Sequence, residues 1–282
     1  MSMEGEGPGD WQAWLAERLP EPRRHLLAQV SAGAARLGLP LYLVGGFVRD
    51  ALLGLVPNDF DLVVEGAAPQ LAQALARELG GTVVGHPAFG TATWQTPEGW
   101  SLDFATARTE TYARPAALPD VQPSDLPADL RRRDITINAM ALRVGPGGQL
   151  HDPYHGRADL AARSIRVLHA GSFADDPTRL FRVVRYEQRL GFAIEPATLG
   201  WMRTAWEALA VLSPDRLRHE FEIIFTEPQA AAMLARLDDL DILAHVHPAL
   251  RWGAAQTEAA RVVEALPLAE WKMAGPVAPG RP

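Results

Sequence analysis

Three acidic residues lie in apolar runs that otherwise predict β-strands. Asp59 and Asp61 flank Phe60 in the segment NDFDLVV, and Asp103 lies in SLDFATART. Because successive side chains of a strand point to opposite faces, Asp59 and Asp61 are expected on the same face. Two adjacent carboxylates repel each other and Asp is unfavourable in strands, so a divalent cation is the simplest compensation. Mg²⁺ suits such a site because it commonly binds a few carboxylates together with substrate phosphates.

A glycine pair precedes these carboxylates. Gly45 and Gly46 follow the apolar run LYLV and begin a segment that predicts a helix. The ordinary role of such a pair is a tight turn between strand and helix. The missing Cβ atoms would also let a triphosphate approach the N–H groups at the helix N-terminus, with Arg49 one turn further on. Together with three carboxylates, the pair predicts a phosphoryl-transfer site with two metal ions.

The elements that must position these residues change in character near Leu150. Before it, strands are predicted at 41–44, 60–64, 82–84, 91–96 and 101–105, and helices at 11–37, 46–53 and 68–79. The proline-rich stretch from Glu110 to Pro127 shows no period and predicts a loop. Further on, helices are predicted at 156–163, 176–190, 196–211, 214–225 and 228–237, with a short strand near 165–168. We therefore expect an α+β fold, with a catalytic domain over residues 1–150 and a helical domain over residues 151–282.

The composition excludes several classes of protein. The chain of 282 residues contains no Cys, which removes disulfides and Cys-ligated zinc. No apolar run approaches the roughly 18 residues that a membrane span requires. The N-terminal segment MSMEGEGPGD is acidic and Gly-rich, unlike a signal or transit peptide, so the cytoplasm is the expected compartment.

The charge is distributed unevenly along the chain. The formal net charge is −7, yet residues 131–189 contain eleven Arg and six acidic residues, a local balance of +5. The remainder then carries −12. The basic region predicts contact with nucleic acid at one part of the surface, because the acidic remainder repels phosphates.

These segments together resemble the class II tRNA nucleotidyltransferase / poly(A) polymerase family of the nucleotidyltransferase superfamily. The resemblance covers roughly residues 41–226 and runs through LVGGFVRDALLG, NDFDLVV, LPADLRRRDITINAMAL, SFADDPTRLFRVVRYEQRLGF and LSPDRLRHEFEIIF. It implies a head domain with a small mixed sheet and an all-α neck, with body and tail domains beyond. Residues 151–282 are expected to form the neck and a short body. The implied activity is the Mg²⁺-dependent transfer of CMP and/or AMP from CTP or ATP to the 3′ end of a tRNA, with release of pyrophosphate.

The resemblance also implies roles in the head domain. Asp59 and Asp61 would hold the metal, and Asp103 would assist activation of the attacking hydroxyl. The residues implied in binding the nucleotide are Gly45, Gly46, Arg49, Arg133, Asp134 and Asn138. Of these, Arg133 is expected on the phosphates and Asp134 near the ribose. Arg131 and Arg132 are instead expected to form a solvated charged cluster at a helix end.

In the helical domain, Asp176 and Arg179 lie one turn apart and can present a hydrogen-bond acceptor beside a donor. Cytosine and adenine both offer an amine next to a ring nitrogen, whereas uracil and guanine place a carbonyl opposite the carboxylate. The resemblance implies that this pair selects the base and that Arg182 and Arg185 contact the nucleotide. Asp175 departs from the family pattern, which usually has Glu at this position.

Two further segments are interpreted as structural. His155, in HDPYHGRADL, stands where the family usually has glycine. The segment RLRHE is expected to form a salt bridge between Arg216 and Glu220, one turn apart in the helix.

Three alternatives remain open from the sequence. A poly(A) polymerase shares the same motifs, and enzymes that add only C or only A are also compatible with them. A non-catalytic RNA-binding relative would keep the fold, but the presence of all three carboxylates argues against it. The loop from Arg108 to Leu130 is expected to govern which nucleotide is added.

Overall fold

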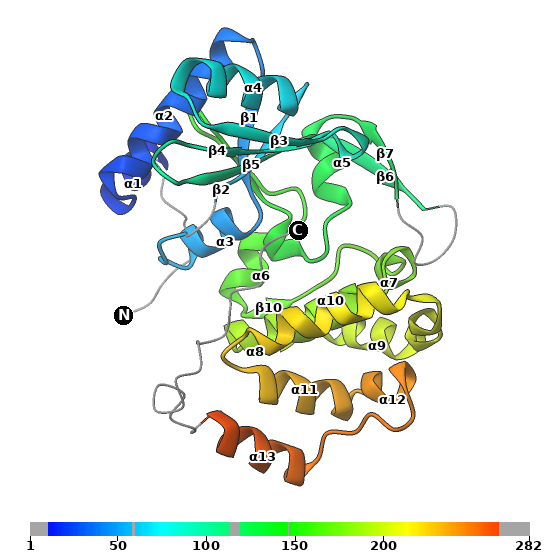
Figure 1. Cartoon of the computed structure of the whole chain (residues 1–282). Helices are drawn as coiled ribbons and strands as arrows, with labels where there is room; N and C mark the ends of the chain where they lie inside the picture. Colours follow the sequence, from blue (N-terminus) through cyan, green and yellow to red (C-terminus); the bar gives the residue numbers. More distant parts are fainter. Residues whose placement is uncertain (1–10, 58–59, 113–118, 146, 265–282) are drawn as a thin grey trace. The chain divides into compact units, whose positions relative to one another are not determined.

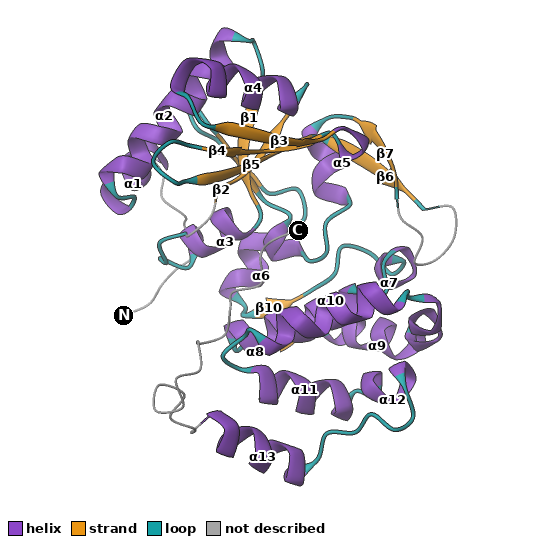
Figure 2. Ribbon diagram, viewed as in Figure 1, coloured by secondary structure: helices purple, strands orange, loops and turns teal. Residues whose placement is uncertain are grey.

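The computed structural model describes residues 11–57, 60–112, 119–145 and 147–264, which form two compact units. The first unit ends at Ala162, and the second begins at Arg163. The expected α+β class is confirmed, with strands concentrated in the first unit and helices in the second (Figure 2).

The first unit contains the strands that carry the predicted catalytic residues Asp61 and Asp103. Its helices are α1 (Trp11–Arg18), α2 (Glu21–Arg36), α3 (Gly46–Leu52), α4 (Ala68–Leu79), α5 (Leu126–Arg131) and α6 (Gly156–Ala161), with 3₁₀ turns η1 (Pro87–Phe89) and η2 (Thr136–Asn138). Its strands are β1 (Leu41–Val44), β2 (Phe60–Val64), β3 (Thr82–His86), β4 (Thr91–Gln95), β5 (Ser101–Thr106), β6 (Arg108–Thr111), β7 (Asp120–Pro123), β8 (Ala141–Arg143) and β9 (Leu150–His151). The bounds of β1, β2 and α4 are those expected from the sequence.

Seven strands form one mixed sheet in the order β3-β4-β5-β2-β1-β8-β9. Figure 1 labels β1 to β5 of this sheet. The pair β2–β5 is parallel, and its neighbours are antiparallel. One face of the sheet carries large buried side chains that include Leu62, Trp94 and Phe104. Helix α4 packs against β4 and β5 on this side, and Ala68 N donates to Thr106 Oγ1. This face therefore supplies the main hydrophobic core of the unit.

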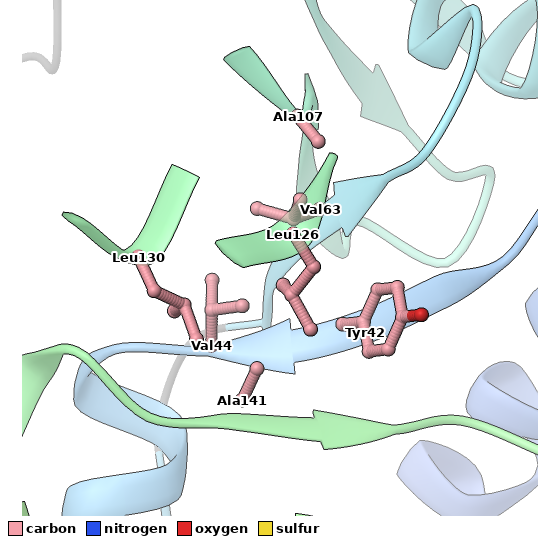
Figure 3. Close-up of a cluster of buried hydrophobic side chains, with 7 residues drawn as sticks. All are labelled: Tyr42, Val44, Val63, Ala107, Leu126, Leu130 and Ala141. Atoms are coloured by element: carbon pink, nitrogen blue, oxygen red, sulfur yellow. The ribbon is translucent and has the colours of Figure 1, made fainter. Parts of the chain in front are cut away.

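The opposite face of the sheet has a smaller apolar cluster beneath α5. Leu126 and Leu130 of this helix pack over Tyr42, Val44 and Val63 (Figure 3). Ala105 of β5 is packed against the same cluster. Residues two apart on a strand share a face, so Asp61 and Asp103 emerge on this side next to the cluster. Helix α5 thus covers part of a face whose remainder carries the carboxylates.

The proline-rich stretch contains more structure than expected. Strands β6 and β7 form a two-stranded antiparallel sheet with Arg108 opposite Pro123 and Thr111 opposite Asp120. The prediction of a loop throughout was therefore wrong for these segments. Cross-strand pairing in a hairpin tolerates proline at a strand end, so the local sequence gave no strand signal. The connecting residues 113–118 lie outside the described residues.

The second unit is mostly helical. Its helices are α7 (Ser172–Asp175), α8 (Arg179–Leu190), α9 (Pro196–Thr204), α10 (Pro214–Phe225), α11 (Ala230–Asp239), α12 (Ile242–Val246) and α13 (Ala254–Glu264), with the 3₁₀ helix η3 (Trp206–Val211). Strands β10 (Ser164–Ile165) and β11 (Ala193–Ile194) pair in parallel. Phe181 of α8 meets Phe221 of α10 at 5.6 Å between ring centroids. Arg236 of α11 binds Glu187 through two nitrogens, at 2.9 and 3.0 Å.

The helix expected over residues 176–190 begins three residues later than expected. Helix α7 ends at Asp175, and Asp176 is extended, with φ −141° and ψ 100°. Helix α8 then begins at Arg179. The cause is Pro177, because the ring of a proline disfavours helical backbone at the preceding residue.

The departure at His155 has a backbone explanation. His155 adopts φ 61° and ψ 33°, the left-handed conformation that glycine reaches without strain. Both carboxylate oxygens of Asp152 accept hydrogen bonds from the first turn of α6, at 2.6 Å from Gly156 N and 3.0 Å from Arg157 N. This capping compensates for the unfavourable residue and holds the chain in the turn.

None of the helices in the described ranges is long and apolar enough to cross a membrane.

Gly156 generates the first prediction. A Cβ atom there would lie well inside van der Waals distance of the Thr136 carbonyl oxygen, and 3.0 Å from Met140 Cγ. Gly156→Ala should therefore lower the free energy of unfolding by about 1–3 kcal/mol, the usual cost of overpacking. Gly200→Ala is the matched control, because Gly200 lies within α9 with nothing within 4 Å of a built Cβ. That change should stabilise by roughly 0.5–1 kcal/mol through helix propensity. Urea unfolding of both variants checks the opposite signs; equal effects would contradict this packing.

Candidate active site

A row of polar side chains crosses three neighbouring strands of the sheet. Asp61 of β2 and Asp103 of β5 are paired residues of the parallel ladder. Thr93 of β4 is paired with Asp103 on its other side and donates a 2.6 Å hydrogen bond from Oγ1 to Asp103 Oδ1. Adjacent strands lie about 4.8 Å apart, so the two carboxylates are close neighbours. Asp61 is exposed and Asp103 is half-buried. The structure thus brings two predicted catalytic carboxylates together.

The third predicted carboxylate, Asp59, lies outside the described residues. Its position two residues before Asp61 predicts the same strand face, and this stays a prediction. In the part of the chain that the structure describes, no group of three or more potential metal-binding side chains is found. Asp61 and Asp103 offer only oxygen ligands, which fits a hard divalent cation better than a softer metal.

The glycine turn lies at the end of β1, beside the strand that carries Asp61. Gly45 has φ 62° and ψ −125° and precedes the first residue of α3. A Cβ atom at Gly45 would lie 3.1 Å from Nη1 of Arg133. Glycine is therefore required here for two reasons, the positive φ and the close approach of a guanidinium.

Arg133 is the cation nearest to this turn. Its side chain is 16% exposed, and Nη2 donates to Asp129 Oδ2 at 3.0 Å. Its Nε is buried and has no hydrogen-bond partner among the described residues. A buried donor without a partner is costly, and an ordered water or a bound ion commonly accounts for one. The geometry is compatible with the expected contact of Arg133 with phosphates, which stays a prediction.

Arg49, Asn138 and Asp134 form a buried hydrogen-bonded chain behind the turn. Arg49 Nη1 donates to Asn138 Oδ1 at 2.8 Å, and Asn138 Nδ2 donates to Asp134 Oδ1 at 3.2 Å. Arg49 also binds Asp50, with Nε 2.8 Å from Oδ1. All three members are at most 6% exposed. In this structure they brace α3 against η2, and their expected contacts with the nucleotide stay predictions.

The predicted base-selecting pair lies in the second unit. Asp176 Oδ1 accepts from Thr178 Oγ1 at 2.7 Å and from Arg216 Nη2 at 2.6 Å. Arg179 is 5% exposed, and its Nη1 donates to the carbonyl oxygen of Ser172 at 3.2 Å. Each of the two side chains is therefore held in place by other residues of the unit.

Arg185 lies in a buried group of charges with Glu220. The distance from Arg185 Nη1 to Glu220 Oε2 is 3.8 Å, which is too long for a hydrogen bond. Burial raises the pKa of Glu220, although Arg182 and Arg185 oppose the shift. Nε and Nη1 of Arg185 are buried and lack hydrogen-bond partners among the described residues. These unsatisfied donors fit the implied nucleotide contact of Arg185, which stays a prediction.

The ion pairs of the segment RLRHE differ from the expected pair within one helix. Arg216 contacts Asp176, which follows α7, and Glu220 lies near Arg185 of α8. Both residues of α10 therefore connect it to other elements. The sequence could not indicate these partners, because they are about 35 to 40 residues away along the chain.

Two residues near the site were missed or misjudged from the sequence. Arg132 was expected in a solvated cluster, but its side chain is only 18% exposed and lies between Asp129 and Glu110. Thr93 gave no signal, because a threonine in a strand is ordinary. The contacts of Arg132 with Glu110 and of Thr93 with Asp103 become visible only when the strands and the hairpin are assembled.

Two segments of the chain match known protein domain families. Residues 41–166 match the poly A polymerase head domain, and residues 191–252 match the probable RNA and SrmB-binding site of polymerase A.

Individual relatives agree with these matches. The A-adding tRNA nucleotidyltransferase of Halalkalibacterium halodurans is 44% identical over 223 residues, covering 77% of this chain and 52% of that enzyme. The CC-adding tRNA nucleotidyltransferase of Deinococcus radiodurans is 43% identical over 199 residues, covering 69% of this chain and 53% of that enzyme. The Thermotoga maritima CCA-adding enzyme complexed with tRNA has a TM-score of 0.79 at 36% identity, covering 93% of this chain and 62% of that one.

The chain spans about half the length of these two curated relatives. The matched segments include the carboxylate strands, the glycine turn and Arg133 in the first unit, and most of the helices of the second unit. The chain belongs to the class II tRNA nucleotidyltransferase / poly(A) polymerase family.

Proposed function

We propose that this chain transfers CMP and/or AMP from CTP or ATP to the 3′ end of a tRNA and releases pyrophosphate. The observation that carries the proposal is the in-register pair of Asp61 and Asp103 beside the glycine turn and Arg133. The names of the relatives support the nature of both substrates, because they include A-adding and CC-adding tRNA nucleotidyltransferases.

Each group of residues has a distinct part in this reaction. Arg133 and the N–H groups of the turn hold the triphosphate in line with the attacking 3′-oxygen. The new bond joins this oxygen to the α-phosphorus, and the bond to the bridging oxygen of pyrophosphate breaks. Asp59 and Asp61 would hold Mg²⁺, which would supply positive charge to the phosphoryl oxygens. Asp103, oriented by Thr93, assists removal of the proton from the 3′-hydroxyl.

Base selection belongs to Asp176 and Arg179. The carboxylate accepts from the exocyclic amine of cytosine or adenine, and the guanidinium donates to the ring nitrogen. Thr178 and Arg216 fix the carboxylate, and the Ser172 carbonyl fixes the guanidinium. Preorganised groups of this kind discriminate well, because a wrong base leaves them without partners.

One incubation tests the function. Purified protein with Mg²⁺ receives tRNA lacking all three terminal nucleotides, or tRNA ending in CC, with labelled CTP or ATP separately. Addition to the first RNA from CTP identifies C addition, and addition to the second from ATP identifies A addition. An unlimited run of A residues would indicate a poly(A) polymerase. No incorporation with either RNA would contradict the proposal and favour an RNA-binding relative.

The carboxylate row generates the second prediction. Asp61→Asn should reduce nucleotide addition by at least about 10³-fold, because a neutral amide binds the cation poorly and leaves the charge at Asp103 unbalanced. The thermal midpoint should be unchanged or higher, since one of two repelling charges is removed. Asp215→Asn is the matched control, because its side chain is 90% exposed in α10. Near-normal turnover of Asp61→Asn would mean that the metal ligands are elsewhere.

The base-selecting pair of Asp176 and Arg179 generates the third prediction. Arg179→Ala should reduce the preference for CTP or ATP over UTP or GTP by about 1–3 kcal/mol, the scale for one bidentate base contact. The ratio of incorporation rates is the readout, because it does not depend on the fraction of active protein. Arg218→Ala, in an arginine whose side chain is 70% exposed, is the control and should keep the ratio. An Arg179→Ala protein that rejected GTP as strongly as the unmodified chain would point to another template.

A further inference from the structure

A network of hydrogen-bonded charged side chains begins on the hairpin formed by β6 and β7. Arg108 donates to Glu110 Oε1 from Nη2 at 2.9 Å, and Arg132 donates to the same oxygen from Nη1 at 3.0 Å. Tyr112 donates from its hydroxyl to Glu110 Oε2 at 2.8 Å. Arg108 Nη1 also donates to the carbonyl oxygen of Phe89 at 2.8 Å. Glu110 therefore joins the hairpin to Arg132, just beyond the end of α5.

This network continues from Arg132 to the glycine turn. Arg132 donates to Asp129 Oδ1 from Nε at 3.0 Å and from Nη2 at 2.7 Å. The other oxygen of Asp129 accepts from Arg133 Nη2 at 3.0 Å. Arg133 Nη1 in turn lies 3.1 Å from the position of a Cβ at Gly45. The buried carboxylate of Asp129 thus joins Arg133, beside the glycine turn, to Arg132, which contacts the hairpin.

The groups that carry this link are removed from solvent. The side chain of Asp129 is 0% exposed, that of Glu110 8% and that of Arg132 18%. Burial alone would raise the pKa of Asp129, but Arg133 and Arg132 outweigh it and hold the pKa below its usual value. In such surroundings each ion pair depends on good geometry, so a shift of one member changes its neighbours.

The geometry of Arg132 makes the link directional. Its planar guanidinium uses one edge for Asp129 and the remaining nitrogen for Glu110. Moving Glu110 would therefore rotate the fork and alter the bond to Asp129. Because Nε of Arg133 has no partner among the described residues, Asp129 is the carboxylate that orients this guanidinium.

We propose that Asp129 is the positioning residue for Arg133 at the triphosphate turn, and that Glu110 couples the β6–β7 hairpin to this position through Arg132. The proposal rests on the proposed function, in which Arg133 binds the triphosphate. It means that the hairpin influences how tightly the phosphates are held, in addition to any effect on the choice of nucleotide. Asp129 and Glu110 act through Arg133 and Arg132 and do not themselves contact the substrate.

Binding measurements without tRNA test the link. Isothermal titration with ATP and with inorganic tripolyphosphate is carried out on the full chain and on Glu110→Gln, Asp129→Asn and the double variant. We expect affinities lower by about threefold for Glu110→Gln and about tenfold for Asp129→Asn, the scale of a lost charged hydrogen bond. The factor should be the same for ATP and tripolyphosphate, because only the phosphates contact Arg133. Residues in one ion-pair network are not additive, so the double variant should lose less than the product.

The controls separate this role from simple destabilisation. Glu78→Gln removes a carboxylate whose side chain is 53% exposed and pairs with Arg36, so it should bind both ligands as the unmodified chain does. Thermal unfolding identifies any variant that does not fold at the titration temperature. If Asp129→Asn fails in this way, Glu110→Gln and Arg132→Lys decide, because both residues keep some contact with solvent. Lysine keeps the charge of Arg132 but lacks the fork, so Arg132→Lys should weaken binding as Glu110→Gln does.

The outcomes distinguish two failures. If the unmodified chain binds both ligands and the folded variants bind them equally well, the link is wrong and the proposed function stands. If the unmodified chain binds neither ATP nor tripolyphosphate, the triphosphate site itself is wrong, and the link fails with it. A double variant whose loss equals the product of the single losses would show that Glu110 and Asp129 act independently.

Discussion

The repulsion between Asp61 and Asp103 is the constraint on which the first unit depends. These residues are paired on parallel strands and share a face with the apolar residues Val63 and Ala105. Helix α5 covers the apolar part of this face, and the carboxylates remain beyond it. The same strands bury Leu62 and Phe104 on the other side. A strand pair that would otherwise be core therefore exposes charge on one face only, where a cation can balance it.

Positive charge beside the carboxylates is held in a corresponding way. The two arginines at the glycine turn each contact a polar residue: Arg49 contacts Asn138 from a distant segment, and Arg133 contacts Asp129, four residues before it. Long arginine side chains lose considerable rotational freedom when they are fixed, and these contacts supply part of the compensation before any ligand binds. A triphosphate would then meet oriented donors, which lowers the entropic cost of binding. Asp176 in the second unit is fixed by the same principle, through Arg216.

A proline and a glycine determine where helices α8 and α3 begin. Pro177 forces Asp176 out of helical geometry, so the carboxylate precedes α8 and can accept from Thr178. Gly45 allows the chain to turn sharply from β1 into α3 beneath Arg133. These backbone features place polar groups at helix starts, where N–H groups are available to anions.

The sequence by itself determined the strands that carry Asp61 and Asp103, the turn at Gly45 and the helical second unit, because periodicity and glycine conformation are local properties. Through resemblance, it also predicted which residues would bind the nucleotide. Only the tertiary structure decided that β6 and β7 pair, that Arg132 is buried between Glu110 and Asp129, and that Arg216 contacts Asp176. The paired residues of β6 and β7 are 9 to 15 positions apart, Arg132 and Glu110 are 22 apart, and Arg216 and Asp176 are 40 apart. The packing of the whole unit decides that such segments meet. An arginine after a helix predicts a solvated charge from its neighbours alone, and its actual partners are fixed only when the sheet, hairpin and helix are assembled.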